Sequence, residues 1–442
     1  MSDSRIDRRV TFAEPSPGGR LARLRASRLV RQNVILFAGG LVAGIGGFVY
    51  HAIAGRVLGP VSYGDVASLI ALYAVLMTPT YILIIVLARY AAQIGGDGGG
   101  SVRYLILRST QVTLLPSILI VVIGALLAGV VADFLHLRSP NSVIWLMAAV
   151  AVIWQVAIPR GILQGLQSFG WLSANLSMEM VVRCSSLGVL LFVGGRVSGA
   201  AAAVLGGAIF AYALGMWSLR DHVREPGERT PLRSMLGFSL TAATGTLGIL
   251  LLYNLDVILA KHFLPAHEAG IYGGLNKIGT ILYFLTLSVS QVLFPRVVEA
   301  LSANNHPGRL LGASALLMLG LGAGSLLVFW AVPGLIVRLL FGPAFADATP
   351  YIFAVGMIGL ALSLDNLLVQ FFMAAHDRWF MPLLAGGVVM LGVLIAVFHG
   401  GVTQVVIDVL ASLLLLLGAL SARLFLLLPK LTAEEPAVVP AA

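Results

Sequence analysis

Charged residues and cysteines are both scarce in this sequence of 442 residues. Only 11% of the residues are charged and Cys184 is the single cysteine, whereas soluble domains carry about 25% charged residues. A single cysteine excludes an internal disulfide. Hydrophobic residues make up 59% of the chain and the mean hydropathy is +0.96, which is more apolar surface than a water-soluble core of this size can bury. The composition excludes a soluble globular protein, a disordered chain and a collagen-like fibre, and it predicts a membrane protein.

The motifs of nucleotide-driven and metal-dependent chemistry are also missing. No G-x-x-x-x-G-K-[ST] sequence occurs, and none of the three lysines follows a glycine, which argues against an ATP-driven pump. Neither an H-E-x-x-H motif nor paired cysteines are present. The expected outer loops are about twelve residues or shorter, so they leave no room for an extramembrane catalytic segment. We therefore expect a transporter rather than an enzyme, with no catalytic residues, no metal site and no cofactor.

Twelve apolar segments are long enough to cross about 30 Å of hydrocarbon as helices. Their limits are 34–55, 65–87, 105–131, 142–159, 171–193, 198–219, 234–260, 269–293, 310–332, 348–374, 379–398 and 403–428. These runs are far longer than the roughly ten residues of a membrane barrel strand. The first run is too long for a signal peptide and no cleavage site follows it. The sequence predicts an all-α integral membrane protein with about twelve transmembrane helices.

The distribution of Lys and Arg predicts the orientation of these helices. With both termini cytoplasmic, 21 of the 28 basic residues lie on the inner side and two lie inside spans. The remaining five lie in outer loops and are Arg56, Arg138, Arg196, Lys261 and Arg338. This asymmetry is the positive-inside rule, and it explains the net charge of +9 without any nucleic-acid partner. We expect a multi-pass protein of the cytoplasmic (inner) membrane. Within the Arg-rich tail, residues 20–31 are consistent with a basic helix on the inner leaflet or with a disordered segment.

The two halves of the chain resemble each other. Leu58-Gly-Pro-Val-Ser-Tyr-Gly64 follows the first span, and Leu264-Pro-Ala-His-Glu-Ala-Gly270 follows the seventh, at an offset of 206. A duplicated unit of six spans inserts both copies in the same orientation, so their pseudo-two-fold axis runs along the membrane normal. The expected division is a cytoplasmic tail, an N-terminal lobe, a cytoplasmic linker, a C-terminal lobe and a cytoplasmic C-terminal tail. The corresponding ranges are 1–33, 34–219, 220–233, 234–428 and 429–442.

Ionisable residues inside spans are candidates for function, because a charge in hydrocarbon is costly. These residues are Glu179, Arg183, Asp256, Lys277 and Asp365. Glu179 and Arg183 are four residues apart, so they share one helix face and can neutralise each other. Asp256 and Lys277 occupy the outer halves of two helices joined by a short loop. We expect them to pair or to share a polar network, either as a gate or as a static lock.

Pro79 lies in the middle of the second span and should kink that helix. Interrupted helices often mark transport pathways, and a purely structural bend is the alternative.

The segment Gly55-Arg-Val-Leu-Gly-Pro-Val-Ser-Tyr-Gly64 resembles the L-G-P-x-x-Y-G signature of Wzx-type oligosaccharide flippases. Asn254-Leu-Asp256 and Gly270-Ile-Tyr272 extend the resemblance into the second half, although 264–270 lacks L-G-P. These flippases belong to the multidrug/oligosaccharidyl-lipid/polysaccharide (MATE-like) superfamily. The resemblance implies alternating access that flips a polyprenyl-diphosphate-linked oligosaccharide for polysaccharide export. The resemblance leaves open whether transport is coupled to protons or to sodium ions.

For such a substrate, Arg89, Arg296 and Arg183 are the expected diphosphate-binding or cavity residues, since guanidinium groups match phosphate oxygens. Glu179 or Asp365 is the expected proton or sodium site. The alternative for Arg89 and Arg296 is that they anchor the protein to lipid headgroups. The alternative for the acidic residues is a buried structural pair. The expected partners are the glycolipid, membrane lipids, and a polysaccharide polymerase or glycosyltransferases. Alternative functions are a cation-coupled multidrug exporter, a lipid II flippase and a membrane enzyme.

Overall fold

The computed structural model describes residues 20–97, 101–223, 236–302 and 307–433, and no strand occurs among them. The first half contains α1 (Arg20–Leu76), α2 (Thr78–Asp97), α3 (Val102–Leu126), α4 (Ala128–Phe134), α5 (Asn141–Gly165), α6 (Phe169–Phe192), α7 (Arg196–Ser218) and α8 (Arg220–Val223). The second half contains α9 (Leu236–Phe263), α10 (Ala266–Ser302), α11 (Pro307–Ala331), α12 (Pro333–Leu340), η1 (Pro343–Tyr351), α13 (Ile352–Ala374), α14 (Phe380–Val397) and α15 (Val402–Ala433). The predicted all-α membrane fold is confirmed.

The described residues contain eleven apolar helical stretches long enough to span a membrane. The first of these, Val34–Ile94, has 61 residues, which as one straight helix would be about three times as long as the hydrocarbon is thick. Gly59 interrupts it with φ 70° and ψ 172°, a left-handed conformation that glycine adopts without a steric penalty. The stretch therefore contains two crossings that turn at Gly59, in agreement with the twelve predicted spans.

Two short elements between the ninth and tenth spans were not predicted. The eight-residue helix α12 is too short to cross the membrane, and it carries exposed Leu335 and Leu339. The 3-10 helix η1 follows it and buries Phe345. The connection between these two spans is therefore structured rather than an open loop.

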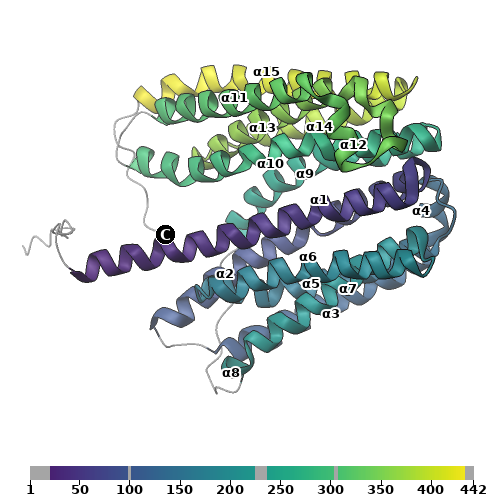
Figure 1. Ribbon diagram of the computed structural model, residues 1–442. Helices are drawn as coiled ribbons and strands as arrows, with labels where there is room; N and C mark the ends of the chain where they lie inside the picture. The colour runs from purple at the N-terminus through teal and green to yellow at the C-terminus, as the bar shows by residue number, and fades with distance from the viewer. Residues whose placement is uncertain (1–19, 98–100, 224–235, 303–306, 434–442) are drawn as a thin grey trace, which may run out of the picture.

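Figure 1 shows the two halves on either side of α1, with α9 to α15 along one side and most of α2 to α8 along the other. The two sets of helices approach each other at the end where α4 and α12 lie, and they separate toward the end where α8 lies. Helix α1 packs on α6 of its own half and on α9 and α10 of the other half. The two halves are therefore in contact mainly at one end of the molecule.

Residues related by the internal repeat touch each other at this end. A Cβ on Gly64 would lie 3.0 Å from the backbone nitrogen of Gly270, its equivalent at the offset of 206. One helical turn further along, a Cβ on Gly273 would lie 2.8 Å from Cβ of Ala67, which is again the equivalent residue. Two equivalent positions can meet only beside the axis that relates them. The pseudo-two-fold axis thus runs between the start of α10 and the part of α1 after Gly59.

Candidate functional site

A cluster of charged side chains lies inside the first half, between α5 and α6. Arg160 on α5 and Arg183 on α6 each donate to a different carboxylate oxygen of Glu179. Arg160 also donates from Nε to the Asn175 side chain at 2.8 Å. The Arg160, Glu179 and Arg183 side chains are only 11%, 5% and 9% exposed. Since arginine stays protonated, this cluster carries a net positive charge in the interior of the lobe.

An aromatic side chain lies beside this cluster. The Arg183 guanidinium carbon lies 5.7 Å from the centre of the Tyr73 ring, within the range of a cation–π contact. Arg183 and Tyr73 are thus partners in the interior of the lobe. The neutral ring supplies no negative charge, so the net positive charge of the cluster can attract an anionic group.

The break between α1 and α2 lies one turn away from the Tyr73 ring. The backbone N–H of Met77 donates to the carbonyl of Tyr73 at 2.9 Å, and Met77 itself is not helical. The indole N–H of Trp154 on α5 donates to the carbonyl of Leu76 at 3.0 Å. Pro79 lies in the first turn of α2, directly after this break. A proline without an N–H leaves carbonyls free in the preceding turn, and Trp154 occupies one of the carbonyls beside the break.

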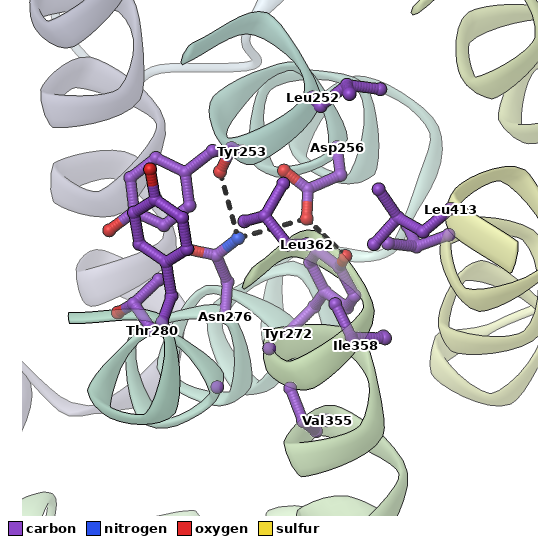
Figure 2. A pocket seen from close by; sticks show the side chains of 14 residues that line it. Leu252, Tyr253, Asp256, Tyr272, Asn276, Thr280, Val355, Ile358, Leu362 and Leu413 are labelled. Carbon is purple, nitrogen blue, oxygen red and sulfur yellow. Dashed lines mark hydrogen bonds between the residues drawn. The ribbon is translucent and has the colours of Figure 1, made fainter. Parts of the chain in front are cut away.

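A small pocket lies inside the second half, with room for about one water molecule. Figure 2 shows the Asp256 carboxylate at its centre, with Tyr272 and Asn276 pointing toward it. The Tyr272 hydroxyl donates to Asp256 at 2.5 Å and the Asn276 amide donates at 3.0 Å. Asn276 also donates to the carbonyl of Tyr253. The Asp256 charge is thus satisfied by neutral hydroxyl and amide donors.

Lys277 does not form the expected direct ion pair with Asp256 in the described residues. Its ammonium group lies 4.8 Å from the centre of the Tyr253 ring, while Asp256 bonds to the neighbouring Asn276. Lys277 acts on Asp256 only through its more distant charge. The expectation of a direct pair is wrong, because residues 276 and 277 point about 100° apart on a helix and Asn276 holds the position nearest the carboxylate. A shared polar network through Asn276 and Tyr253 is what the structure contains.

Asp365 lies on α13 and is fully buried, with an exposed fraction of 0%. Neither of its carboxylate oxygens has a hydrogen-bond partner in the described part of the chain. It does not line the pocket in Figure 2, although Leu362, one turn earlier on α13, does. Asp365 and Asp256 are therefore two separate buried carboxylates in the second half, and only Asp256 is satisfied by donors.

Arg89 on α2 and Arg296 on α10 are both exposed and lie in the C-terminal halves of their helices. The structure brings neither of them to the cluster around Glu179 or to the pocket around Asp256. Their roles remain predictions.

A second buried ion pair joins the two halves at the end where they meet. The Lys261 ammonium lies 2.7 Å from a carboxylate oxygen of Asp65, and both side chains are at most 4% exposed. The sequence reading placed Lys261 in an outer loop, and this was wrong because α9 continues to Phe263. Nearby, Arg56 donates to the last carbonyls of α12, those of Arg338 and Leu339.

The sequence reading missed Arg160, Asp65 and Lys261 as partners in buried ion pairs. Arg160 directly follows an apolar run, but the apolar pattern resumes at Gly161-Ile-Leu163, and α5 extends to Gly165. That resumption is the signal for a buried arginine. Asp65 directly follows the Tyr63-Gly64 end of the first signature, and only the fold identifies its partner.

A family model described as "Polysaccharide biosynthesis protein" matches residues 29–301, which is more than half of the chain. Among curated proteins, none matches.

Several solved structures share the fold. An inward-facing multidrug resistance MATE transporter of the MOP superfamily superposes with a TM-score of 0.76 at 11% identity, covering 91% of this chain and 100% of that one. An outward-facing MATE transporter of the same superfamily has a TM-score of 0.63 at 15% identity, covering 92% and 96%. A MOP superfamily transporter from Pyrococcus furiosus, described by the reverse polarity of its binding pocket, has a TM-score of 0.62 at 15% identity, covering 92% and 96%. These similarities show a MATE-like fold.

Proposed function

Because the chain belongs to the polysaccharide biosynthesis protein family and has the fold of a multi-pass MATE-like membrane transporter, we propose that it flips a polyprenyl-diphosphate-linked oligosaccharide. Transport by alternating access moves the glycan across the cytoplasmic membrane while the lipid tail stays in the bilayer. The two six-helix lobes, 34–219 and 234–428, are the moving parts in this proposal, and both termini are cytoplasmic.

The observation that carries the proposal is the positive cluster in the first lobe. Two guanidinium groups share the single carboxylate of Glu179, so one positive charge is left without a partner among buried side chains. A buried net charge is costly, which favours binding of an anion there. A diphosphate carries several charged oxygens that match guanidinium donors. Arg160 and Arg183 are the proposed phosphate-binding groups, and Glu179 positions both of them.

The inter-lobe contacts support an inward-open state. The polar contacts between the lobes, including Asp65 with Lys261 and Arg56 with the end of α12, lie at the outer end. The higher TM-score with the inward-facing MATE structure than with the outward-facing one is in line with this arrangement. In this state the headgroup enters from the cytoplasmic leaflet, where the exposed Arg89 and Arg296 are proposed to meet it first.

Asp365 is the proposed proton-binding group. An ionised carboxylate without any donor is unfavourable in an apolar interior, and Asp365 has no donor among the described residues. Glu179 is less suited to this role, because two guanidinium groups stabilise its charged form. Of the two acids expected to couple transport to protons or sodium, the geometry thus favours Asp365.

Proteoliposomes loaded with undecaprenyl-diphosphate-linked oligosaccharide provide the test. The protected fraction of glycan, measured with a lectin or glycosidase added outside, reports flipping. Arg160→Ala and Arg183→Ala are expected to reduce the flipping rate about tenfold or more, since each removes a charge-assisted contact with the diphosphate.

Arg196→Ala is the matched control, because Arg196 begins α7 at the outer end and lies outside the cluster. Its flipping rate should equal that of the unmodified protein. Normal flipping by correctly folded Arg160→Ala and Arg183→Ala would show that the cluster does not bind the substrate.

Export of organic cations is the second candidate function, and the acidic and aromatic lining of the small pocket around Asp256 favours it. A carboxylate beside the Tyr253 and Tyr283 rings is a suitable environment for an organic cation. Efflux of a fluorescent cation from the same proteoliposomes tests this function. Loss of that efflux in Asp256→Asn, with unchanged glycolipid flipping, would assign the pocket to cation transport.

A further inference from the structure

We infer that the Asp65–Lys261 ion pair is the lock that holds the outer side of the transporter closed. The inference rests on the proposed alternating access, because it assigns the pair to one of the two states. Asp65 lies on α1 after the turn at Gly59 and belongs to the first lobe, while Lys261 lies in the last turn of α9 and belongs to the second. Their 2.7 Å contact therefore crosses the boundary between the lobes.

The surroundings of the pair indicate that it forms only when the lobes meet. Both side chains are at most 4% exposed, so neither charge is hydrated when the lobes are closed at this end. Gly64, the residue next to Asp65, packs against the backbone of Gly270 from the other lobe. Tyr63 on the same turn stacks edge-on with Phe341 and at 5.6 Å with Phe345. Separation of the lobes at this end exposes both charges to water at the same time.

A buried ion pair suits a contact that must open. The desolvation cost of the two ions largely offsets their attraction, so the pair adds little net stability to the closed state. It is nevertheless selective, because a single unpaired charge would be strongly disfavoured in the same place. The pair thus specifies which surfaces close on each other without making the closed state too stable to reopen.

The inter-lobe distances on the two sides of the membrane test this lock by double electron–electron resonance. Spin labels are attached to cysteines introduced into a Cys184→Ser background, reconstituted in lipid nanodiscs. Asn141→Cys with Ala346→Cys reports the outer side, and Gln164→Cys with Arg309→Cys reports the inner side. All four labelled positions are exposed, and each pair contains one position from each lobe.

Asp65→Asn and Lys261→Gln each leave one charge unpaired in the closed state. Each is expected to increase the population with long outer and short inner distances by about a hundredfold relative to the closed population. The double variant removes both charges and should return the distances toward those of the unmodified protein. Asp377→Asn is the matched control, since Asp377 pairs with Arg423 inside the second lobe, and it should leave the inter-lobe distances unchanged.

Outer distances that stay short in both folded single variants would overturn the lock. Outer distances in the double variant that are as long as those in the single variants would overturn it as well. If Asp65→Asn does not fold, Asp65→Glu takes its place. Displacement of the carboxylate by one methylene should shift the distances in the same direction, and unchanged distances would again overturn the lock. The flipping assay on the unmodified protein tests the proposed function separately. If the unmodified protein flips no glycolipid but the outer side opens when Lys261 is replaced, the lock is supported and the proposed substrate is refuted.

Discussion

Replacement of Glu179 by glutamine should destabilise the protein, and an added diphosphate lipid should restore its stability. Glu179→Gln keeps the size of the side chain but removes the one negative charge between Arg160 and Arg183. The three side chains are no more than 11% exposed, so solvent screens the two remaining positive charges only weakly. Removal of one partner from a buried ion pair costs about 3–5 kcal/mol, and we expect a loss of this size.

Undecaprenyl diphosphate supplies negative charge where the carboxylate is missing. It is therefore expected to raise the unfolding temperature of Glu179→Gln in detergent by more than that of the unmodified protein. Intrinsic tryptophan fluorescence follows unfolding, and undecaprenol, which has the same tail without phosphates, is the control ligand. Asp377→Asn is the control variant, because it breaks an ion pair far from the proposed site. Equal stabilisation of Glu179→Gln by the diphosphate and the alcohol would refute the assignment of the cluster to an anion.

Two further predictions concern the contact of the lobes and the inner arginines. Gly270→Ala places a Cβ 1.8 Å from the carbonyl oxygen of Pro60, and this overpacking should destabilise the closed state by about 1–3 kcal/mol. Double electron–electron resonance should then show longer outer distances between the lobes. Gly312→Ala is the control, because its Cβ has nothing within 4 Å, and it should leave these distances unchanged. The double variant Arg89→Lys with Arg296→Lys keeps both charges but removes the bidentate forks. It should slow glycolipid flipping severalfold in proteoliposomes, and an unchanged rate would assign both arginines to lipid anchoring.

The twelve crossings were predictable because the bilayer allows only long apolar helices or closed barrels. The turn at Gly59 coincides with the glycine of the first L-G-P, and the repeat was visible as an offset of 206 between the two copies of that stretch. The partners of individual charges were less predictable. Glu179 and Arg183 share a helix, so their contact follows from spacing alone. Their second partner, Arg160, comes from another helix, and hydropathy contains no information on the rotation of one helix against another.

The same limitation explains why Asp256 and Lys277 share a polar network rather than a direct ion pair. A short connection correctly predicts that α9 and α10 are neighbours, but it does not determine which residue of α10 faces Asp256. Lys261 shows a different limit, since a lysine after an apolar run normally lies at the membrane surface. It is buried here because the other lobe supplies Asp65, and a contact across two lobes leaves no local pattern in the sequence.

The contact of Gly64 with its own repeat equivalent, Gly270, has a consequence for the origin of the chain. A residue that touches its symmetry mate is the hallmark of an isologous interface, the kind that holds two identical subunits together. The ancestor in this view was a homodimer of six-helix subunits whose interface had one glycine of each subunit on the dyad. The two copies now differ at this interface, since Lys261 faces Asp65 while its equivalent, Gly55, faces Phe341. Two polypeptides obtained by dividing the chain within 224–233 should therefore reassemble when expressed together, because the contacts of Gly64 with Gly270 and of Asp65 with Lys261 join residues on either side of the division.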